Sequence, residues 1–125
     1  MDDLQLIDLA RETLPFAYAP YSNYRVGAAL LTAEGKVFRG VNIENVSYGL
    51  TICAERSALA AAITGGYRSF IALAVVSETE NKPFPCGACL QVLREFSGDL
   101  KIIVAGKGAK YEAFTIGELL PYPFK

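Results

Sequence analysis

Three cysteines at two expected helix starts constrain this chain more than any other feature of its sequence. Cys53 lies in the segment TICAER (51–56), and Cys86 and Cys89 lie in PCGAC (85–89). In each segment a loop is expected to enter a helix, whose first turn presents unpaired N–H groups and a partial positive charge. Such a position lowers the pKa of a thiol and favours the thiolate. A fold that brings the two helix starts together would place three thiolates around one point.

The spacing of the cysteines is typical of a catalytic zinc site. Cys86 and Cys89 can chelate one tetrahedral metal, Cys53 can supply a third ligand, and a fourth position stays open for water. A CxxC pair alone is equally typical of a redox pair or of half a structural zinc site. The 125 residues include no histidine, which excludes imidazole ligands and His-dependent nucleophiles. A proton carrier near neutral pH must then be a carboxylate, a lysine, a tyrosine or metal-bound water.

Glu55 and Arg56 follow the first cysteine directly. A carboxylate in the first turn of a helix can serve the helix dipole alone, but Glu55 is also the candidate proton carrier. Three thiolates and one zinc ion carry an excess of one negative charge, which weakens the Lewis acidity of the metal. A guanidinium that donates to the sulfurs would offset this charge, so Arg56 is predicted to support the metal site rather than lie free on the surface.

Hydrophobic spacing and turn residues predict alternating helices and strands. Helices are expected at 3–14, 52–63, 88–96 and 116–120, and strands at 24–32, 37–43, 71–77, 101–105 and 111–115. The first two strands should form a hairpin, and the continuous apolar run of the third is typical of a central strand covered on both faces. This order predicts an α/β fold, a mixed sheet with helices on its faces. No repeat or linker is present, so we expect one domain over 1–125.

Charge and hydropathy exclude some partners. Lys and Arg total 12 against 13 Asp and Glu, which leaves no basic surface for nucleic acid and favours a small, neutral ligand. Hydrophobic residues make up 52% of the chain, which favours oligomerisation. No apolar run reaches the roughly 18 residues of a membrane span. The acidic start, Met1-Asp2-Asp3, is unlike a signal peptide, so we expect the protein in the cytoplasm.

The motifs together match a known signature. Cys53-x-Glu55 followed by Pro85-Cys86-x-x-Cys89 is the pattern of zinc-dependent deaminases in its three-cysteine form, in which the glutamate is the general acid and base and not a ligand. The chain resembles the small cytidine deaminases over essentially its whole length, including FAYAPYSNYRVGAA at 16–29 and NIEN at 42–45. The resemblance implies a three-layer αβα sandwich with a mixed five-stranded sheet, one Zn²⁺ per chain and a homotetramer with shared sites. It also implies hydrolysis of cytidine and deoxycytidine to uridine and deoxyuridine with release of ammonia, a reaction of pyrimidine salvage.

The same resemblance assigns roles to residues of the substrate site. Asn42 and Glu44 are implied to bind the ribose 3′-hydroxyl. This hydroxyl both donates and accepts hydrogen bonds, and an amide and a carboxylate can together satisfy both functions. Ala54 is implied to contact the base through its backbone. Glu55 is implied to carry protons from an activated water to the ring nitrogen and then to the departing amine.

Two aromatic positions are implied to complete the site. Tyr24 stands where the family commonly carries a phenylalanine that stacks near the base, and its ring face is retained. Phe124 stands where related chains place an aromatic that reaches a neighbouring subunit's site, and Tyr48 is a second candidate for such a role.

Three alternatives stay open at this level. One is a deaminase of another small aminopyrimidine nucleoside, such as a nucleoside antibiotic. A non-catalytic zinc module would need a fourth protein ligand, which the cysteine count does not supply. The third alternative is a thiol-disulfide oxidoreductase, which would need no metal and would give Glu55 no catalytic function.

Overall fold

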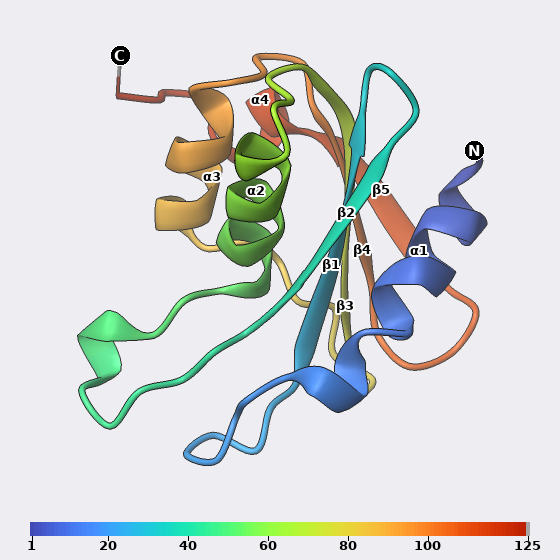
Figure 1. The fold of residues 1–125 in the computed structure, drawn as a ribbon. Coiled ribbons are helices and arrows are strands. Elements are labelled where there is room, and N and C mark those ends of the chain that lie inside the picture. The colour runs from blue at the N-terminus through green and yellow to red at the C-terminus, as the bar shows by residue number, and fades with distance from the viewer. Residues whose placement is uncertain (125) are drawn as a thin grey trace.

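The computed structural model describes residues 1–124 and contains a five-stranded sheet with helices on both faces (Figure 1). The strand order is β2-β1-β3-β4-β5. β3 and β4 pair in parallel, whereas the other neighbours pair antiparallel. The helices and strands are α1 (Asp3–Arg11), β1 (Val26–Thr32), β2 (Val37–Val41), α2 (Ala54–Thr64), β3 (Phe70–Ser77), α3 (Gly87–Arg94), β4 (Lys101–Ala105), β5 (Tyr111–Thr115) and α4 (Ile116–Leu119). The predicted α/β class and mixed five-stranded sheet are confirmed.

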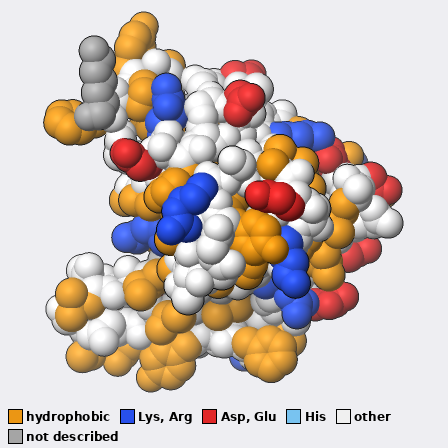
Figure 2. Space-filling model, turned by 45° about the horizontal axis from the view of Figure 1, so that its top comes forward, with side chains coloured by type: hydrophobic (Ala, Val, Ile, Leu, Met, Phe, Trp, Pro, Cys, Tyr) orange, Lys and Arg blue, Asp and Glu red, His pale blue; other side chains and the backbone are white. Residues whose placement is uncertain are grey.

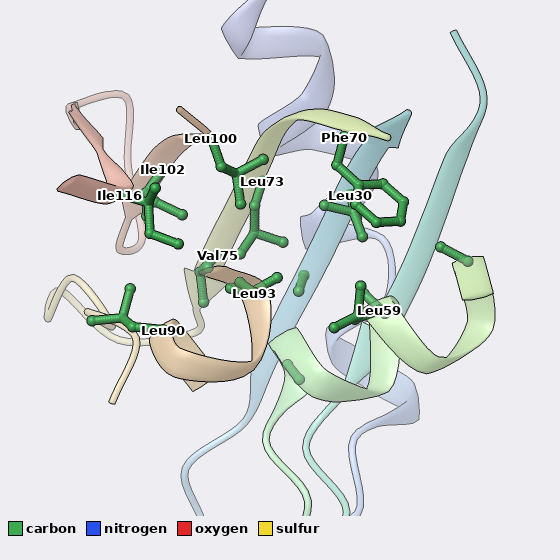
Figure 3. Close-up of a cluster of buried hydrophobic side chains, with 14 of the residues drawn as sticks. Leu30, Leu59, Phe70, Leu73, Val75, Leu90, Leu93, Leu100, Ile102 and Ile116 are labelled. Carbon is green, nitrogen blue, oxygen red and sulfur yellow. The ribbon is translucent and has the colours of Figure 1, made fainter. Parts of the chain in front are cut away.

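The molecule has three layers because the sheet is covered on both faces. Figure 1 shows α1 on one side of the sheet and α2 and α3 on the other. Side chains of β3 alternate between the faces, as the period of a strand requires. Leu73 and Val75 pack with Leu59 of α2 and with Leu90 and Leu93 of α3 (Figure 3). On the opposite face of the sheet, Ala72, Ala74 and Val76 belong to a second hydrophobic cluster, which includes the buried side chains of α1.

The N-terminal helix α1 is shorter than the predicted helix 3–14. It begins with a capping box, in which the Asp2 carboxylate accepts the Gln5 N–H at 2.8 Å and the Gln5 side chain accepts the Asp2 N–H at 2.9 Å. It ends at Arg11, and a short 3-10 helix over Leu14–Phe16, which contains a proline, continues the chain. The proline is tolerated in this new first turn but not inside α1, so the chain turns before reaching it.

Helix α2 starts two residues later than predicted. Ile52 exchanges backbone hydrogen bonds of 2.9 Å with Ile43 in both directions, so the chain is still extended there. Cys53 keeps extended backbone angles as the N-cap, and the helix begins at the next residue. The remaining boundaries lie within two residues of those predicted.

Helix α2 lies very close to strand β2 at Gly40. A Cβ at this position would stand 2.3 Å from the Ala58 backbone nitrogen and 2.6 Å from the Ala54 carbonyl oxygen. Only the absence of a side chain permits this contact. The contact holds the first turn of α2 against the sheet.

None of the helices within residues 1–124 combines the length and apolar character needed to cross a membrane.

Candidate metal centre

The three cysteine sulfurs converge at the starts of α2 and α3. Cys53 is the N-cap of α2, Cys86 is the N-cap of α3, and Cys89 lies in the first turn of α3. Their Sγ atoms all lie within 4.8 Å of one another. A tetrahedral zinc ion with Zn–S bonds of about 2.3 Å would hold its sulfurs about 3.8 Å apart, a spacing that small side-chain rotations reach. The predicted meeting of two helix starts is confirmed.

The thiols of the cluster interact strongly with one another. The pKa of Cys53 is lowered to about 5, first because it accepts a hydrogen bond from Cys89 and further because of the Arg56 guanidinium, against the opposing effect of burial. The pKa of Cys89 is raised because its thiol donates to Cys53 and because it is buried. Cys53 is therefore the thiolate of this pair. Sulfur donors this close together suit a soft, tetrahedral metal.

Arg56 faces the sulfurs rather than solvent. Its Nη2 donates to Cys53 Sγ at 3.4 Å, and the thiolate raises the pKa of the guanidinium. Its Nε is buried and has no hydrogen-bond partner among residues 1–124. The guanidinium thus brings positive charge to a cluster of three potential thiolates and offsets part of their negative charge. The position fits the predicted supporting role.

Glu55 is the second residue of α2 and is 5% exposed. Burial raises the pKa of Glu55 to about 7, and the negative charge of Cys53 acts in the same direction, while Arg56 opposes it. A carboxyl group with a pKa close to neutrality can both accept and donate a proton there. Its position beside the sulfur cluster fits a proton carrier better than a residue that serves only the helix dipole.

A pocket of about 370 Å³ adjoins the sulfurs. Its volume lies in the range of small-molecule sites. The structure brings most of the sequence-predicted site residues to its walls, and they are Tyr24, Asn42, Glu44, Cys53, Ala54, Glu55 and Cys86. The pocket lies between the two helix starts and two loops that pair with each other through the bridges Tyr18–Ile43 and Ile43–Ile52. These loops extend beyond the sheet at the lower end of the view in Figure 1.

Asn42 is buried, and its side chain has a structural role that the sequence did not predict. Its Oδ1 accepts the Val26 N–H at 3.0 Å, and its Nδ2 donates to the Tyr24 carbonyl at 2.8 Å. The side chain therefore replaces a backbone partner where β1 begins, which explains why the predicted strand 24–32 starts two residues late. One N–H of the amide is not used by these bonds.

Glu44 is partly exposed at the rim of the pocket and holds the neighbouring loop in place. Its carboxylate accepts hydrogen bonds from the Tyr21 N–H at 2.9 Å, from the Ser22 N–H at 3.1 Å and from the Ser22 hydroxyl. These bonds, the Ser22 hydroxyl first, lower the pKa of Glu44. A charged acceptor therefore stands at the edge of the pocket at neutral pH.

Phe124 and Tyr48 lie outside this pocket within one chain. Phe124 is 84% exposed, and its backbone is bound to Gln91 of α3. Tyr48 is 74% exposed and contacts Tyr21 edge to face, with ring centroids 5.9 Å apart. The structure of the single chain therefore does not bring either ring to its own metal centre.

Sequence reasoning missed several residues of the pocket wall, and they are Ser22, Val26, Thr51, Pro83 and Phe84. Phe84 is 51% exposed and packs on Phe114 of β5, with ring centroids 5.4 Å apart. Its proximity in sequence to a predicted metal ligand could have identified it. Thr51 and Pro83 are about as close in sequence to a predicted ligand, and Ser22 and Val26 each lie two residues from Tyr24, so the same signal applies to them.

Comparison with known proteins places the chain among enzymes of one kind. The family described as "Cytidine and deoxycytidylate deaminase zinc-binding region" matches residues 1–106. A cytidine deaminase from Halalkalibacterium halodurans is 47% identical over 125 residues, which span 99% of this chain and 95% of the relative. A probable cytidine deaminase from Dictyostelium discoideum is 51% identical over 116 residues, covering 92% and 78% of the two chains.

Solved structures agree with these similarities in sequence. The crystal structure of cytidine deaminase from Burkholderia pseudomallei superimposes with a TM-score of 0.95 and 47% identity. The match covers 99% of this chain and 100% of the other. The whole described fold, including the arrangement of layers, is therefore shared with that protein.

Proposed function

This chain belongs to the family of zinc-dependent cytidine and deoxycytidylate deaminases, and from this premise we propose that it hydrolyses cytidine, and deoxycytidine, to the uracil nucleoside and ammonia. One observation carries the proposal. Three sulfurs within 4.8 Å of one another adjoin a pocket whose wall also contains Glu55, which is 5% exposed. A metal-binding cluster and a buried acid in one pocket are the two parts that this hydrolysis needs.

One zinc ion per chain fits the cluster, with Cys53, Cys86 and Cys89 as its ligands. When bound, the ion supplies Lewis acidity that makes water a nucleophile near neutral pH. Arg56 donates to the Cys53 sulfur and so withdraws negative charge from the ligand set. We propose it as a supporting residue that does not touch the substrate.

Glu55 is proposed to carry every proton of the reaction. It accepts a proton from the attacking water and delivers it to N3 of the base, which makes C4 electrophilic. After attack at C4 it takes the remaining hydroxyl proton and delivers it to the exocyclic amine, which leaves as ammonia. One carboxyl group suffices because its pKa lies at about 7, so neither protonation state is strongly disfavoured.

The pocket wall is proposed to hold the nucleoside. The Tyr24 ring stacks near the base, and the backbone of Ala54, the first residue of α2, contacts its polar edge. Asn42 retains an unused N–H and Glu44 is an ionised acceptor, so together they can bind the ribose 3′-hydroxyl. Phe84 adds an aromatic wall to the same pocket.

The alternatives are less well supported. The relatives at 47% and 51% identity are named cytidine deaminases, which does not favour an antibiotic nucleoside as substrate. A closed structural zinc site would need a fourth protein ligand, and the cluster found among residues 1–124 has three members. We also propose a homotetramer, and a reducing compartment such as the cytoplasm, where the three cysteines stay available as thiolates.

The proposed function is tested by ultraviolet absorbance during incubation with cytidine, with zinc quantified in the same sample. We expect the absorbance of cytidine to convert to that of uridine, one ammonia per uridine formed, and about one zinc per chain. Cys86→Ser should lose both zinc and turnover. Zinc-loaded protein that leaves cytidine and deoxycytidine intact would overturn the proposal.

A further inference from the structure

The C-terminal segment is held by a side chain that no part of the proposed mechanism uses. The carboxamide of Gln91, in α3, makes two hydrogen bonds to the backbone of one residue. Its Nε2 donates to the Phe124 carbonyl at 2.7 Å, and its Oε1 accepts the Phe124 N–H at 2.9 Å. A carboxamide that binds both polar groups of one residue acts as the edge of a neighbouring strand would.

This contact differs from the usual way in which a chain end is held. Phe124 is 84% exposed and Tyr122 is 92% exposed, so apolar burial within residues 1–124 does not anchor these residues. Fixing a chain end costs conformational entropy, and the two hydrogen bonds to Gln91 offset part of that cost. The result is a backbone in a defined place with an aromatic ring that faces outward. Figure 1 shows this segment passing beside α3.

The helix that holds the segment is the one that carries two of the sulfurs. Gln91 follows Cys89 by two residues, and Cys86 is the N-cap of the same helix. A shallow hollow between the helix and the segment is lined by Gln91, Arg94, Glu95, Pro123 and Phe124, away from the pocket beside the sulfurs. The segment is therefore fixed relative to the metal centre of its own chain, while Phe124 stays exposed and outside the pocket of that centre.

We infer that Gln91 is a positioning residue that clamps the backbone of Phe124 on α3 and so presents the exposed ring to the substrate pocket of a second copy of this chain. The inference rests on the proposed shared-site assembly for its last step, but the clamp itself is a property of one chain. Without the clamp the segment samples many conformations, and each binding event must order it again. Substrate binding would weaken while the chemical step and the metal would be unaffected.

The test replaces Gln91 by methionine, which keeps the length of the side chain but removes its donor and its acceptor. Glu95→Gln is the matched control, because Glu95 lines the same hollow, whereas within residues 1–124 the side chain that binds the Phe124 backbone is that of Gln91. We expect faster hydrogen exchange of the Phe124 amide in Gln91→Met, and a KM for cytidine raised roughly three- to tenfold with kcat and zinc content unchanged. The control should leave all four quantities as in the parent.

A double variant shows whether Gln91 acts through Phe124. Adding Gln91→Met to Phe124→Ala should not raise KM further, because the ring that the clamp positions is already gone. Unchanged exchange of the Phe124 amide in Gln91→Met would overturn the clamp. Faster exchange with an unchanged KM, or a loss of zinc or kcat, would overturn the positioning role. A parent protein inactive on cytidine would instead refute the proposed function, and the exchange experiment would still decide whether the clamp exists.

Discussion

Glu55 is the buried acidic residue of the pocket wall, whereas Glu44 lies at its rim. Glu55 is 5% exposed, and burial raises the pKa of its carboxyl group to about 7. Replacing it by glutamine keeps the size and the hydrogen-bonding capacity but removes the ability to take up and release a proton. We expect Glu55→Gln to retain zinc and fold while kcat falls by at least about 10²-fold, the loss typical of a missing general acid and base. Rates measured with zinc-loaded protein check this, and a variant with most of its turnover would remove Glu55 from the mechanism.

Glu44 holds the neighbouring loop and is proposed to bind the ribose, so its replacement should affect specificity. The lowered pKa keeps its carboxylate charged as the pH falls through the ordinary range of glutamate, and its contribution is lost only below that range. We expect Glu44→Ala to raise KM for cytidine and to narrow the preference for cytidine over free cytosine, because the sugar hydroxyl loses its partner. Glu34→Ala, in the exposed turn between β1 and β2, is the control. Equal efficiency of the parent on the two compounds would refute the ribose assignment.

At the scale of elements, the metal centre depends on two helices that start at the same place. Because Cys53, Cys86 and Cys89 are the potential ligands that converge there among residues 1–124, the bound metal should have three sulfur ligands and one exchangeable oxygen. X-ray absorption of the zinc-loaded protein measures this directly. Four sulfurs around the metal would indicate a closed site between chains and would contradict the arrangement described above.

The close contact between α2 and β2 at Gly40 should be needed to hold α2 in place against the sheet. In Gly40→Ala the new methyl group would stand 2.3 Å from a backbone nitrogen of α2, and backbone cannot move aside as a flexible side chain can. We expect a loss of stability of about 1–3 kcal/mol or more, together with weaker zinc binding, because the displaced helix carries Cys53. Thermal unfolding and zinc titration measure the two effects. Gly49→Ala is the control, since a Cβ there has no neighbour within 4 Å, and equal behaviour of the two variants would disprove the role of the contact.

At the scale of the whole molecule, large apolar side chains remain on the surface of the single chain. Several lie on the two loops around the pocket, and they include Phe16, Tyr18, Tyr21, Val46, Tyr48 and Leu50. Figure 2 shows hydrophobic surface along the lower edge of the molecule and beside the C-terminal end. Contiguous apolar surface of this kind is typical of an interface between subunits.

Assembly should therefore contribute to substrate binding. We expect light scattering to give a homotetramer at working concentrations. Phe124→Ala should have a raised KM and unchanged zinc content, because a ring that covers the substrate excludes water and strengthens the polar contacts beneath it. A monomer with full activity would overturn the shared site and leave the deaminase assignment intact.

The sequence by itself determined those features of the protein that depend on residues close together in the chain. Helix starts, capping and the spacing of cysteines are local properties, so the two segments that carry the metal ligands and Glu55 could be identified without a structure. The order of helices and strands followed from hydrophobic spacing in the same way. A predicted boundary was wrong where a residue pairs with a segment outside its own element. Ile52 shows this, because its pairing with Ile43 delays the start of α2.

Only the tertiary structure decided the properties that depend on segments far apart in the chain. The sulfurs of Cys53 and Cys89 come together because α2 and α3 pack on one face of the sheet, and the shifted pKa values follow from that packing. The burial of Glu55, the second task of Asn42 and the aromatic wall at Phe84 arise in the same way. Burial and electrostatic environment are sums over all neighbours in space, and most of those neighbours are distant in sequence.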